Sequence, residues 1–379
     1  MTRAAPGGPK QIALAKALRS RILDGDFVPH EPIESEVKLA EFYGVSRGTI
    51  RQALATLERD GLLIRMPGKG TYVNPPSQRE RIGRISVVID STAGFRGNFC
   101  LLEIIEGIRE AAGAGGLGNS VSTSFVVCET VDACAGDLRE LTRGADGVLS
   151  VSFSKSFGEA VSQASQDGPA WMNFFGRINN SKTCQIYVNQ AEGAAKAVSY
   201  LLHSGHRRIG LVVVPATAMG GNATELRITG YCQALESHGL SFEPDLVRQV
   251  LPYAQDVEDG VRRLLDRSSE VTGIIIGGGV LTYPVVRAIQ AMHIDIPREL
   301  SVIAFDDTSE AQILNPPLSV IKQPLVAGAM SAFQQLLAMI RQSAPRLGLE
   351  MPLSPELVIR DSCMPPKVRQ PHQAAGLAK

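Results

Sequence analysis

The sequence lacks long apolar runs, and this absence limits where the protein can reside. It has 379 residues, of which 44% are hydrophobic and 20% charged. No run approaches the ~20 consecutive apolar residues that a membrane span needs. The opening segment, MTRAAPGGP, also lacks the apolar core of a signal peptide. The sequence therefore predicts a cytoplasmic protein with no membrane partner.

Cysteine is scarce, and its spacing argues against a disulfide framework or a zinc site. The six cysteines lie far apart and include no C-x-x-C pair. Histidine is equally scattered, and His203-x-x-His206 precedes Arg207-Arg208 at a predicted helix end, as a solvated charged segment does. The sequence therefore predicts reduced thiols and no metal.

The motifs of common enzymes are missing too. No G-x-G-x-x-G follows the first predicted strand, and G-x-x-x-x-G-K-[ST], G-x-S-x-G and H-E-x-x-H do not occur. Gly277-Gly278-Gly279 follows a predicted strand without a lysine, which is typical of a close-approach loop. No paired acid/base residues are evident in the predicted cleft beyond Asp306-Asp307. We therefore expect neither an enzyme nor a cofactor.

Charge is balanced overall but distributed unevenly. Residues 1–84 hold 14 Lys and Arg against 9 Asp and Glu, although the whole chain has 38 of each kind. A cationic segment suits an anionic partner, and the remainder of the chain carries the opposite excess.

The cationic segment also contains three predicted helices and a hairpin. Apolar spacing predicts a helix over 10–24, Ser35 can cap a second helix, and Gly44 allows a sharp turn. Ser46 can cap a third helix, whose exposed face would carry Arg47 and Arg51 near its first turns. A helix that presents arginines there suits the major groove of duplex DNA.

Two short strands follow, over 62–65 and 71–73, joined by the turn Pro67-Gly68-Lys69-Gly70. The glycines permit close backbone approach to a phosphate, and Lys69 adds a positive charge. This arrangement predicts a winged helix-turn-helix.

The same segment resembles the DNA-binding domain of GntR-type regulators. The matching residues are Ser35-Glu36, Leu39-Ala40, Gly44-Val45-Ser46-Arg47, Thr49-Ile50-Arg51, Ala53-Leu54, Leu57, Gly61-Leu62 and Gly68-x-Gly70-Thr71-x-Val73. The resemblance implies DNA contacts from Ser35, Ser46, Arg47, Thr49, Arg51, Gly68, Lys69 and Gly70. Val37, His30 and Glu34 depart from the usual pattern, which alters the expected base preference.

From Ile85 onward, apolar strands alternate with amphipathic helices. This alternation predicts parallel sheets with helices on both faces. We expect a DNA-binding domain over 10–73, a charged linker over 74–84, an α/β body over 85–363 and a disordered tail over 364–379.

The body resembles the effector domain of LacI-type repressors, which is similar to periplasmic binding proteins. The resemblance rests on Gly205-His206-Arg207-Arg208-Ile209, Arg227-x-x-Gly230-Tyr231, Ile296 to Asp307, Pro316-Pro317-Leu318-Ser319, Lys322-Gln323-Pro324 and Pro355 to Ser362. It implies two lobes with an effector between them, and a GntR-type head on such a body is the arrangement of arabinose-responsive repressors.

In that family, the residues matching Arg227 and Asp306 bind polar groups of the effector, as suits a hydroxyl-rich ligand. Asp90 and Phe99 are placed on the same cleft rim, as are Phe174 and Tyr253. Gly278 stands where the family often has Asn, so the ligand is expected to be less hydroxylated than a typical sugar or to bind through water.

The sequence thus predicts a homodimeric, sequence-specific transcription regulator, a repressor by family habit, controlled by a sugar or sugar derivative. Two alternatives remain open at this point. One is an architectural DNA-binding protein whose body only oligomerises, which would show salt-dependent binding with little sequence preference. The other is a metabolic enzyme with a fused DNA-binding head.

Overall fold

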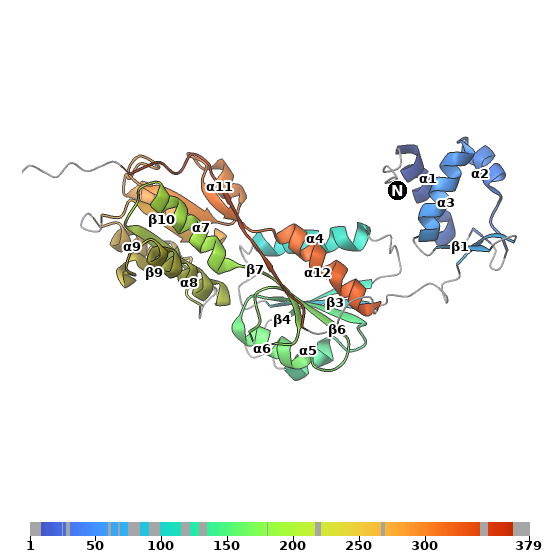
Figure 1. Ribbon diagram of the computed structural model, residues 1–379, viewed down its shortest axis with the longest axis horizontal. Coiled ribbons are helices and arrows are strands. Elements are labelled where there is room, and N and C mark those ends of the chain that lie inside the picture. Colours follow the sequence, from blue (N-terminus) through green and yellow to red (C-terminus); the bar gives the residue numbers. More distant parts are fainter. Residues whose placement is uncertain are drawn as a thin grey trace, which may run out of the picture. The chain divides into compact units, whose positions relative to one another are not determined.

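The chain forms two compact units (Figure 1). The computed structural model describes residues 9–24, 26–27, 31–59, 62–66, 69–74, 84–90, 99–114, 122–128, 135–179, 181–216, 221–266, 270–341 and 348–366. One unit consists of residues 1–84 with 112–122, and the other of residues 85–111 with 123–379. We call the described residues of 9–74 the head and those from 84 onward the body. Among the described residues, no helix is both long and apolar enough to cross a membrane.

The head has three helices and a two-stranded sheet. Its elements are α1 (Pro9–Asp24), α2 (Glu36–Tyr43), α3 (Arg47–Arg59), β1 (Leu63–Met66) and β2 (Gly70–Val73). Ser35 caps α2 by accepting a hydrogen bond from the backbone N–H of Lys38, and Gly44 ends it with φ 61°. The strands pair antiparallel, with Leu63 opposite Val73. The predicted winged helix-turn-helix is present.

One apolar cluster holds the head together. It joins side chains of all three helices to the start of the hairpin, and its fully enclosed members include Leu18, Leu39, Ile50, Leu57 and Leu63. Because Ile50, Ala53 and Leu57 recur at three and four residues along α3, this face is buried and the opposite face is left to solvent.

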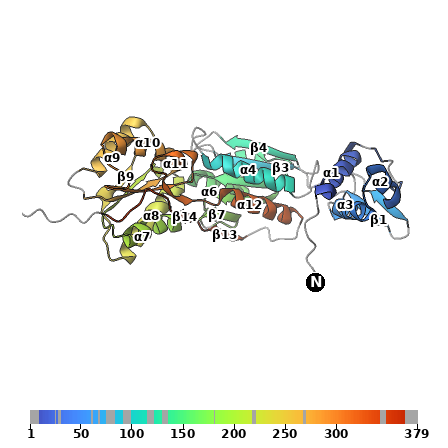
Figure 2. The ribbon, with the colours of Figure 1, turned by 90° about the horizontal axis from the view of Figure 1, so that it is seen from above.

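The body contains two six-stranded sheets, each with helices on both faces (Figures 1 and 2). In the first lobe the order is β13-β7-β6-β5-β3-β4. Its elements are β3 (Arg84–Asp90), α4 (Phe99–Ala114), β4 (Ser122–Cys128), α5 (Ala135–Leu141), β5 (Gly147–Ser152), α6 (Lys155–Ala164), β6 (Ala170–Phe175), β7 (Cys184–Val188), α12 (Leu325–Ile340) and β13 (Glu350–Leu353).

The second lobe repeats the design with the order β14-β12-β11-β10-β8-β9. Its elements are α7 (Gln190–His203), β8 (Ile209–Val213), α8 (Gly221–Ser237), η3 (Pro244–Leu246), β9 (Val247–Gln249), α9 (Ala254–Leu264), β10 (Gly273–Gly277), α10 (Gly279–Ala291), β11 (Ser301–Phe305), α11 (Ser309–Ile313), β12 (Ser319–Lys322) and β14 (Glu356–Val358). All its pairings are parallel except that of β14 with β12.

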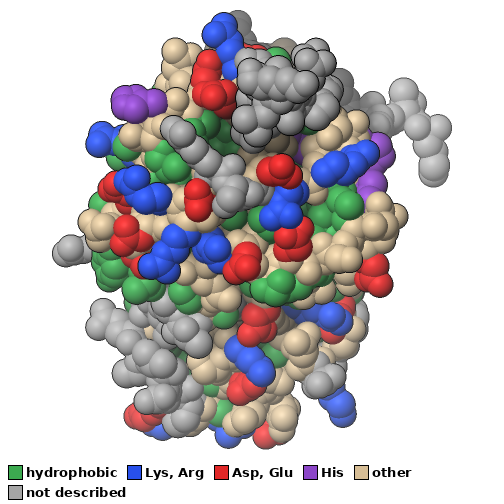
Figure 3. All heavy atoms as spheres, turned by 90° about the vertical axis from the view of Figure 1, so that its left-hand side faces the viewer, with side chains coloured by type: hydrophobic (Ala, Val, Ile, Leu, Met, Phe, Trp, Pro, Cys, Tyr) green, Lys and Arg blue, Asp and Glu red, His purple; other side chains and the backbone are tan. Residues whose placement is uncertain are grey.

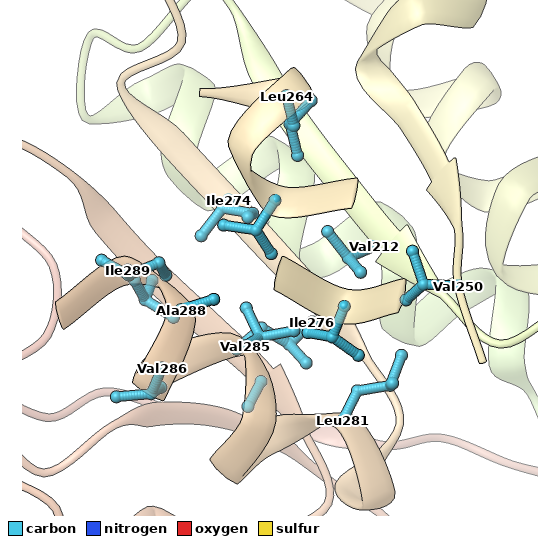
Figure 4. Packing of buried hydrophobic residues seen from close by; sticks show 14 of the residues in the cluster. Val212, Val250, Leu264, Ile274, Ile276, Leu281, Val285, Val286, Ala288 and Ile289 are labelled. Carbon is cyan, nitrogen blue, oxygen red and sulfur yellow. The ribbon is translucent and has the colours of Figure 1, made fainter. Parts of the chain in front are cut away.

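Two apolar clusters flank the second sheet. Figure 4 shows the cluster in which Ile274 and Ile276 of β10 meet Val285 and Ile289 of α10. The neighbouring residue Ile275 faces the other way and packs with α7 and α8. Burial on both faces explains why these strands read as continuous apolar runs.

The chain passes between the lobes three times. The first crossover, at Asn189, joins β7 to α7; the second, at Gln323-Pro324, joins β12 to α12; and the third, at Ser354-Pro355, joins β13 to β14. Each lobe is therefore assembled from separate stretches of sequence. The predicted two-lobed α/β body is confirmed.

Charges of both signs cover the end of the body that faces the left side of Figure 1. There, Lys and Arg side chains are interspersed with Asp and Glu (Figure 3). In the second lobe, Arg262 of α9 pairs with Glu258 of the same helix at 2.9 Å. This mixture contrasts with the cationic excess expected of a face that binds nucleic acid.

Candidate functional site

The first turn of α3 is fixed by Ser46. The Ser46 Oγ accepts a hydrogen bond from the backbone N–H of Thr49 at 3.2 Å and lies 2.8 Å from the Thr49 Oγ1. Arg47 opens the helix and is exposed. The predicted serine cap thus presents an arginine at the positive end of the helix dipole, where a phosphate also binds well.

Glu36 holds two arginines of the head. The Glu36 carboxylate accepts from the Arg51 Nη2 at 2.9 Å and from the Arg51 Nε at 3.3 Å, and the Arg65 Nη2 lies 3.5 Å away. Its side chain is only 18% exposed, whereas that of Arg51 is 63% exposed. The hydrogen bond from Arg51 is the main cause that lowers the pKa of Glu36. The carboxylate therefore stays charged and orients both guanidinium groups.

The hairpin tip is anchored to the rest of the head. Gly70 has φ 122°, and a Cβ there would meet the Cβ of Pro32 at 3.1 Å. The Tyr72 hydroxyl donates to the carbonyl of Lys69 at 3.2 Å, and the Lys69 side chain is exposed. Gly68 lies outside the described residues. The wing therefore needs glycine at position 70 for a steric reason, which the sequence pattern could indicate only as turn chemistry.

In the body, Asp306 follows β11 in a strained conformation. Its φ is 71°, in the left-handed region that residues with a Cβ seldom adopt. Its Oδ2 accepts from the backbone N–H of Gly279 at 2.7 Å, and its Oδ1 accepts from the Gln323 Nε2. These contacts fix the carboxylate at the end of the strand, where parallel-sheet proteins bind ligands.

Arg227 is buried behind the same sheet end. Its side chain is 6% exposed and donates to the Gln190 Oε1 at 3.0 Å and to the carbonyl of Gly277 at 2.8 Å. The guanidinium also lies 4.3 Å from the centroid of the Phe305 ring. Burial lowers the pKa of Arg227, and the nearby Asp306 carboxylate opposes this effect.

A small pocket lies in front of Asp306. Its volume is about 180 Å³, and both lobes line it: Cys100, Leu102 and Glu103 of α4, residues 306–309, and Lys322, Gln323 and Leu325. Burial is the main cause that raises the pKa of the Cys100 thiol and of the Glu103 carboxyl, and Asp306 adds to both shifts. The pocket thus combines hydrogen-bond acceptors with one ammonium group, Lys322, in a volume below the ~300 Å³ common for drug-sized ligands.

Of the predicted effector residues whose side chains the structure describes, only Asp306 lines this pocket. Gly278 lies close to Arg227, since a Cβ on it would be 3.5 Å from the Arg227 Nη1. Asp90, another predicted effector residue, does not line the pocket. Asp90 is 2% exposed and accepts from the backbone N–H and hydroxyl of Ser154, both at 2.6 Å, so it fixes the loop before α6.

The predicted aromatic residues do not gather at the pocket. Phe174 is fully buried, because Gly328 of α12 lies directly over its ring. Tyr253 is 68% exposed at the start of α9. Phe99 begins α4, and its side chain lies outside the described residues.

Sequence reasoning missed Cys100, Glu103 and Gln190 as constituents of the site. Gln323 was only part of a matching segment, Lys322-Gln323-Pro324. Both glutamines lie within two residues of the end of a strand, β7 or β12, where a polar side chain lies at a sheet end, but neither strand was predicted from the sequence.

Comparison with known proteins agrees with this architecture. Residues 11–73 match the bacterial regulatory proteins of the gntR family, and residues 198–363 match the periplasmic binding protein-like domain. The chain joins a gntR-family head to a periplasmic-binding-protein-like body. The predicted resemblances are thereby confirmed.

Two kinds of relatives resemble the chain over most of its length. An arabinose metabolism transcriptional repressor of Geobacillus stearothermophilus is 24% identical over 371 residues, which cover 93% of this chain and 97% of the relative. A solved structure of the transcriptional regulator CelR in complex with cellobiose covers 94% of this chain and 100% of that one, with TM-score 0.63 and 18% identity. A dimeric Lac repressor covers 75% of this chain and 100% of its own, with TM-score 0.64 and 20% identity. The protein, whose head matches the gntR family and whose body matches the periplasmic binding protein-like domain, is a DNA-binding transcription regulator.

Proposed function

We propose that the head binds an operator with α3 in the major groove. Arg47 and Arg51 would contact base edges, and Lys69 and Gly70 of the wing, with Gly68, would contact the backbone or the minor groove. The capped first turn of α3 and the orientation of Arg51 by Glu36 support this assignment. Ser35, Ser46 and Thr49 lie at the helix starts, where their hydroxyl groups suit phosphate oxygens.

We propose that the effector is a small, uncharged molecule rich in hydroxyl groups, bound at the pocket between the lobes. The observation that carries this proposal is the strained and fully oriented Asp306 carboxylate on a pocket of about 180 Å³. A carboxylate accepts hydroxyl protons well, and the acidic side chains Glu103 and Asp307 disfavour an anionic ligand.

The relatives' names favour the same class of ligand. One relative regulates arabinose metabolism, and structural neighbours were solved with cellobiose and with ribose. On this basis the protein is a repressor whose body dimerises and places two heads on a two-fold symmetric operator. Effector binding changes the lobe arrangement and lowers the affinity of the heads for DNA. To shift the population almost completely from one lobe arrangement to the other, the effector must bind one arrangement on the order of 10⁴ times more tightly than the other.

The experiment uses the full chain and a duplex operator selected from a random pool. Fluorescence anisotropy measures DNA affinity without and with arabinose, ribose or cellobiose, in the wild type and in Asp306→Asn. Asp245→Asn serves as the matched control, because the Asp245 side chain is 96% exposed in the same lobe. We expect one sugar to weaken DNA binding in the wild type and the control but not in Asp306→Asn. Selection of no preferred sequence, together with no response to any sugar, would favour the architectural alternative.

A further inference from the structure

Two buried glutamines connect the proposed effector site to the crossovers between the lobes. Gln190 is the first residue of α7, directly after the first crossover, and Gln323 forms part of the second. Each is 3% exposed, and the Gln190 Nε2 donates to the Gln323 Oε1 at 2.6 Å although 133 positions separate them in the sequence.

The two amides belong to one continuous chain of hydrogen bonds. The Arg227 Nε donates to the Gln190 Oε1, Gln190 donates to Gln323, and the Gln323 Nε2 donates to the Asp306 Oδ1. A guanidinium can only donate and an ionised carboxylate can only accept. The charged groups at the two ends therefore fix the orientation of both amides.

A second link, through Lys196, reaches the third crossover but is more exposed. Lys196 of α7 donates to the Ser354 Oγ and to the carbonyl of Pro355, both at 2.7 Å, and pairs with Glu192 at 2.8 Å. Its side chain is 38% exposed. Since water screens this contact, the enclosed glutamine pair is the stronger link between crossovers.

We propose that Gln190 and Gln323 are positioning residues that orient Arg227 and Asp306 and transmit effector binding to the first two crossovers. This inference rests on the proposed function. An effector that draws on the Asp306 carboxylate alters the hydrogen bond at that end of the chain, which leads through the two amides to Arg227. Because the two amides are polarised by those ends, the change reaches Asn189 and Pro324, where the lobes hinge.

The test replaces one amide at a time in the full chain, as Gln190→Met and Gln323→Met. The matched control is Gln185→Met, because Gln185 is fully buried in β7 and bonds to Ile178 and Glu350, outside the amide chain. Hydrogen exchange is measured without ligand at two crossover amides: that of Asn189, which donates to the Leu353 carbonyl at 2.9 Å, and that of Leu325, which donates to the Gln323 carbonyl at 2.9 Å.

We expect exchange at these two amides to become about fivefold faster in both test variants and to stay near the wild-type rate in Gln185→Met. Equal acceleration in all three variants would mean that any buried amide loss loosens the body, and this would overturn the proposal. Wild-type rates in Gln190→Met and Gln323→Met would overturn it too.

A further variant, Gln190→Glu, separates positioning from transmission. Gln190→Glu keeps an acceptor for Arg227 but removes the donor to Gln323. With whichever of arabinose, ribose and cellobiose the wild type binds, we expect the factor by which the sugar weakens DNA binding to fall about tenfold, more than the sugar affinity falls. Equal losses in both quantities would indicate a merely structural role. If the wild type binds none of these sugars, the proposed effector class fails, while the exchange measurement still decides the inference.

Discussion

Replacing Glu36 by Gln should lower the affinity of the head for its operator while leaving non-specific DNA binding undiminished. The change removes the carboxylate that accepts from Arg51 at 2.9 Å and lies 3.5 Å from Arg65, yet leaves the size of the side chain unchanged. Neither arginine then has a fixed orientation before binding. Each must be ordered at the moment of contact, which costs affinity for a site that depends on guanidinium geometry.

The magnitude follows from the two side chains released. Ordering one long side chain reduces affinity by a factor of about 3 to 10, so two give at least about tenfold for the operator. Non-specific binding needs no fixed geometry. The non-specific affinity should rise roughly a few-fold, because one negative charge near the phosphates is gone. The ratio of specific to non-specific affinity should therefore fall by about 30-fold.

Anisotropy titrations with the selected operator and a scrambled duplex, at several salt concentrations, measure this ratio. Glu41→Gln is the matched control, since Glu41 lies on the same helix, is exposed and forms no ion pair with any described residue. An unchanged ratio in Glu36→Gln, or an equal fall in Glu41→Gln, would refute the idea that Glu36 orients the arginines.

Three further predictions concern single positions. Lys69→Ala should reduce the slope of log affinity against log salt by about 0.9, as titrations at several salt concentrations would show, if the wing contacts one phosphate. Gly230→Ala should strongly destabilise the body in urea unfolding, because its Cβ would lie 1.9 Å from the carbonyl oxygen of Ala191 and force α7 and α8 apart. His206 is buried, and burial lowers its pKa below the ordinary 6.5. The unfolded chain then binds the proton more readily, so stability present above pH 6.5 should be lost as the pH falls through the folded pKa; His206→Gln should flatten this dependence in urea unfolding at each pH.

The fold of the head could be predicted from the sequence, because the residues that start and end its helices act locally. Ser35, Gly44 and Ser46 act within a few residues, and each has the expected capping or turning role. The contact between Glu36 and Arg51 was not predictable, because it joins different helices through long side chains whose rotamers the sequence does not specify.

In the body, the alternation of strands and helices predicted the architecture but not the direction of individual side chains. Every residue of β6 is buried, so no alternation marks which face Phe174 occupies. Gln190 and Gln323 are far apart in sequence, and only the crossing of the lobes brings them together. Asp306 was predicted through resemblance, whereas its strained backbone became apparent only in the structure.

The position of α12 has a consequence for the growing polypeptide on the ribosome. This helix covers β5, β6 and β7, although it lies about 140 residues or more after these strands in the chain. Until it emerges, the apolar face around Phe174 stays open to water, so the nascent first lobe is a natural target for chaperones and for aggregation. The head needs none of these later residues. A prematurely terminated chain would therefore bind DNA although its effector-binding body is incomplete.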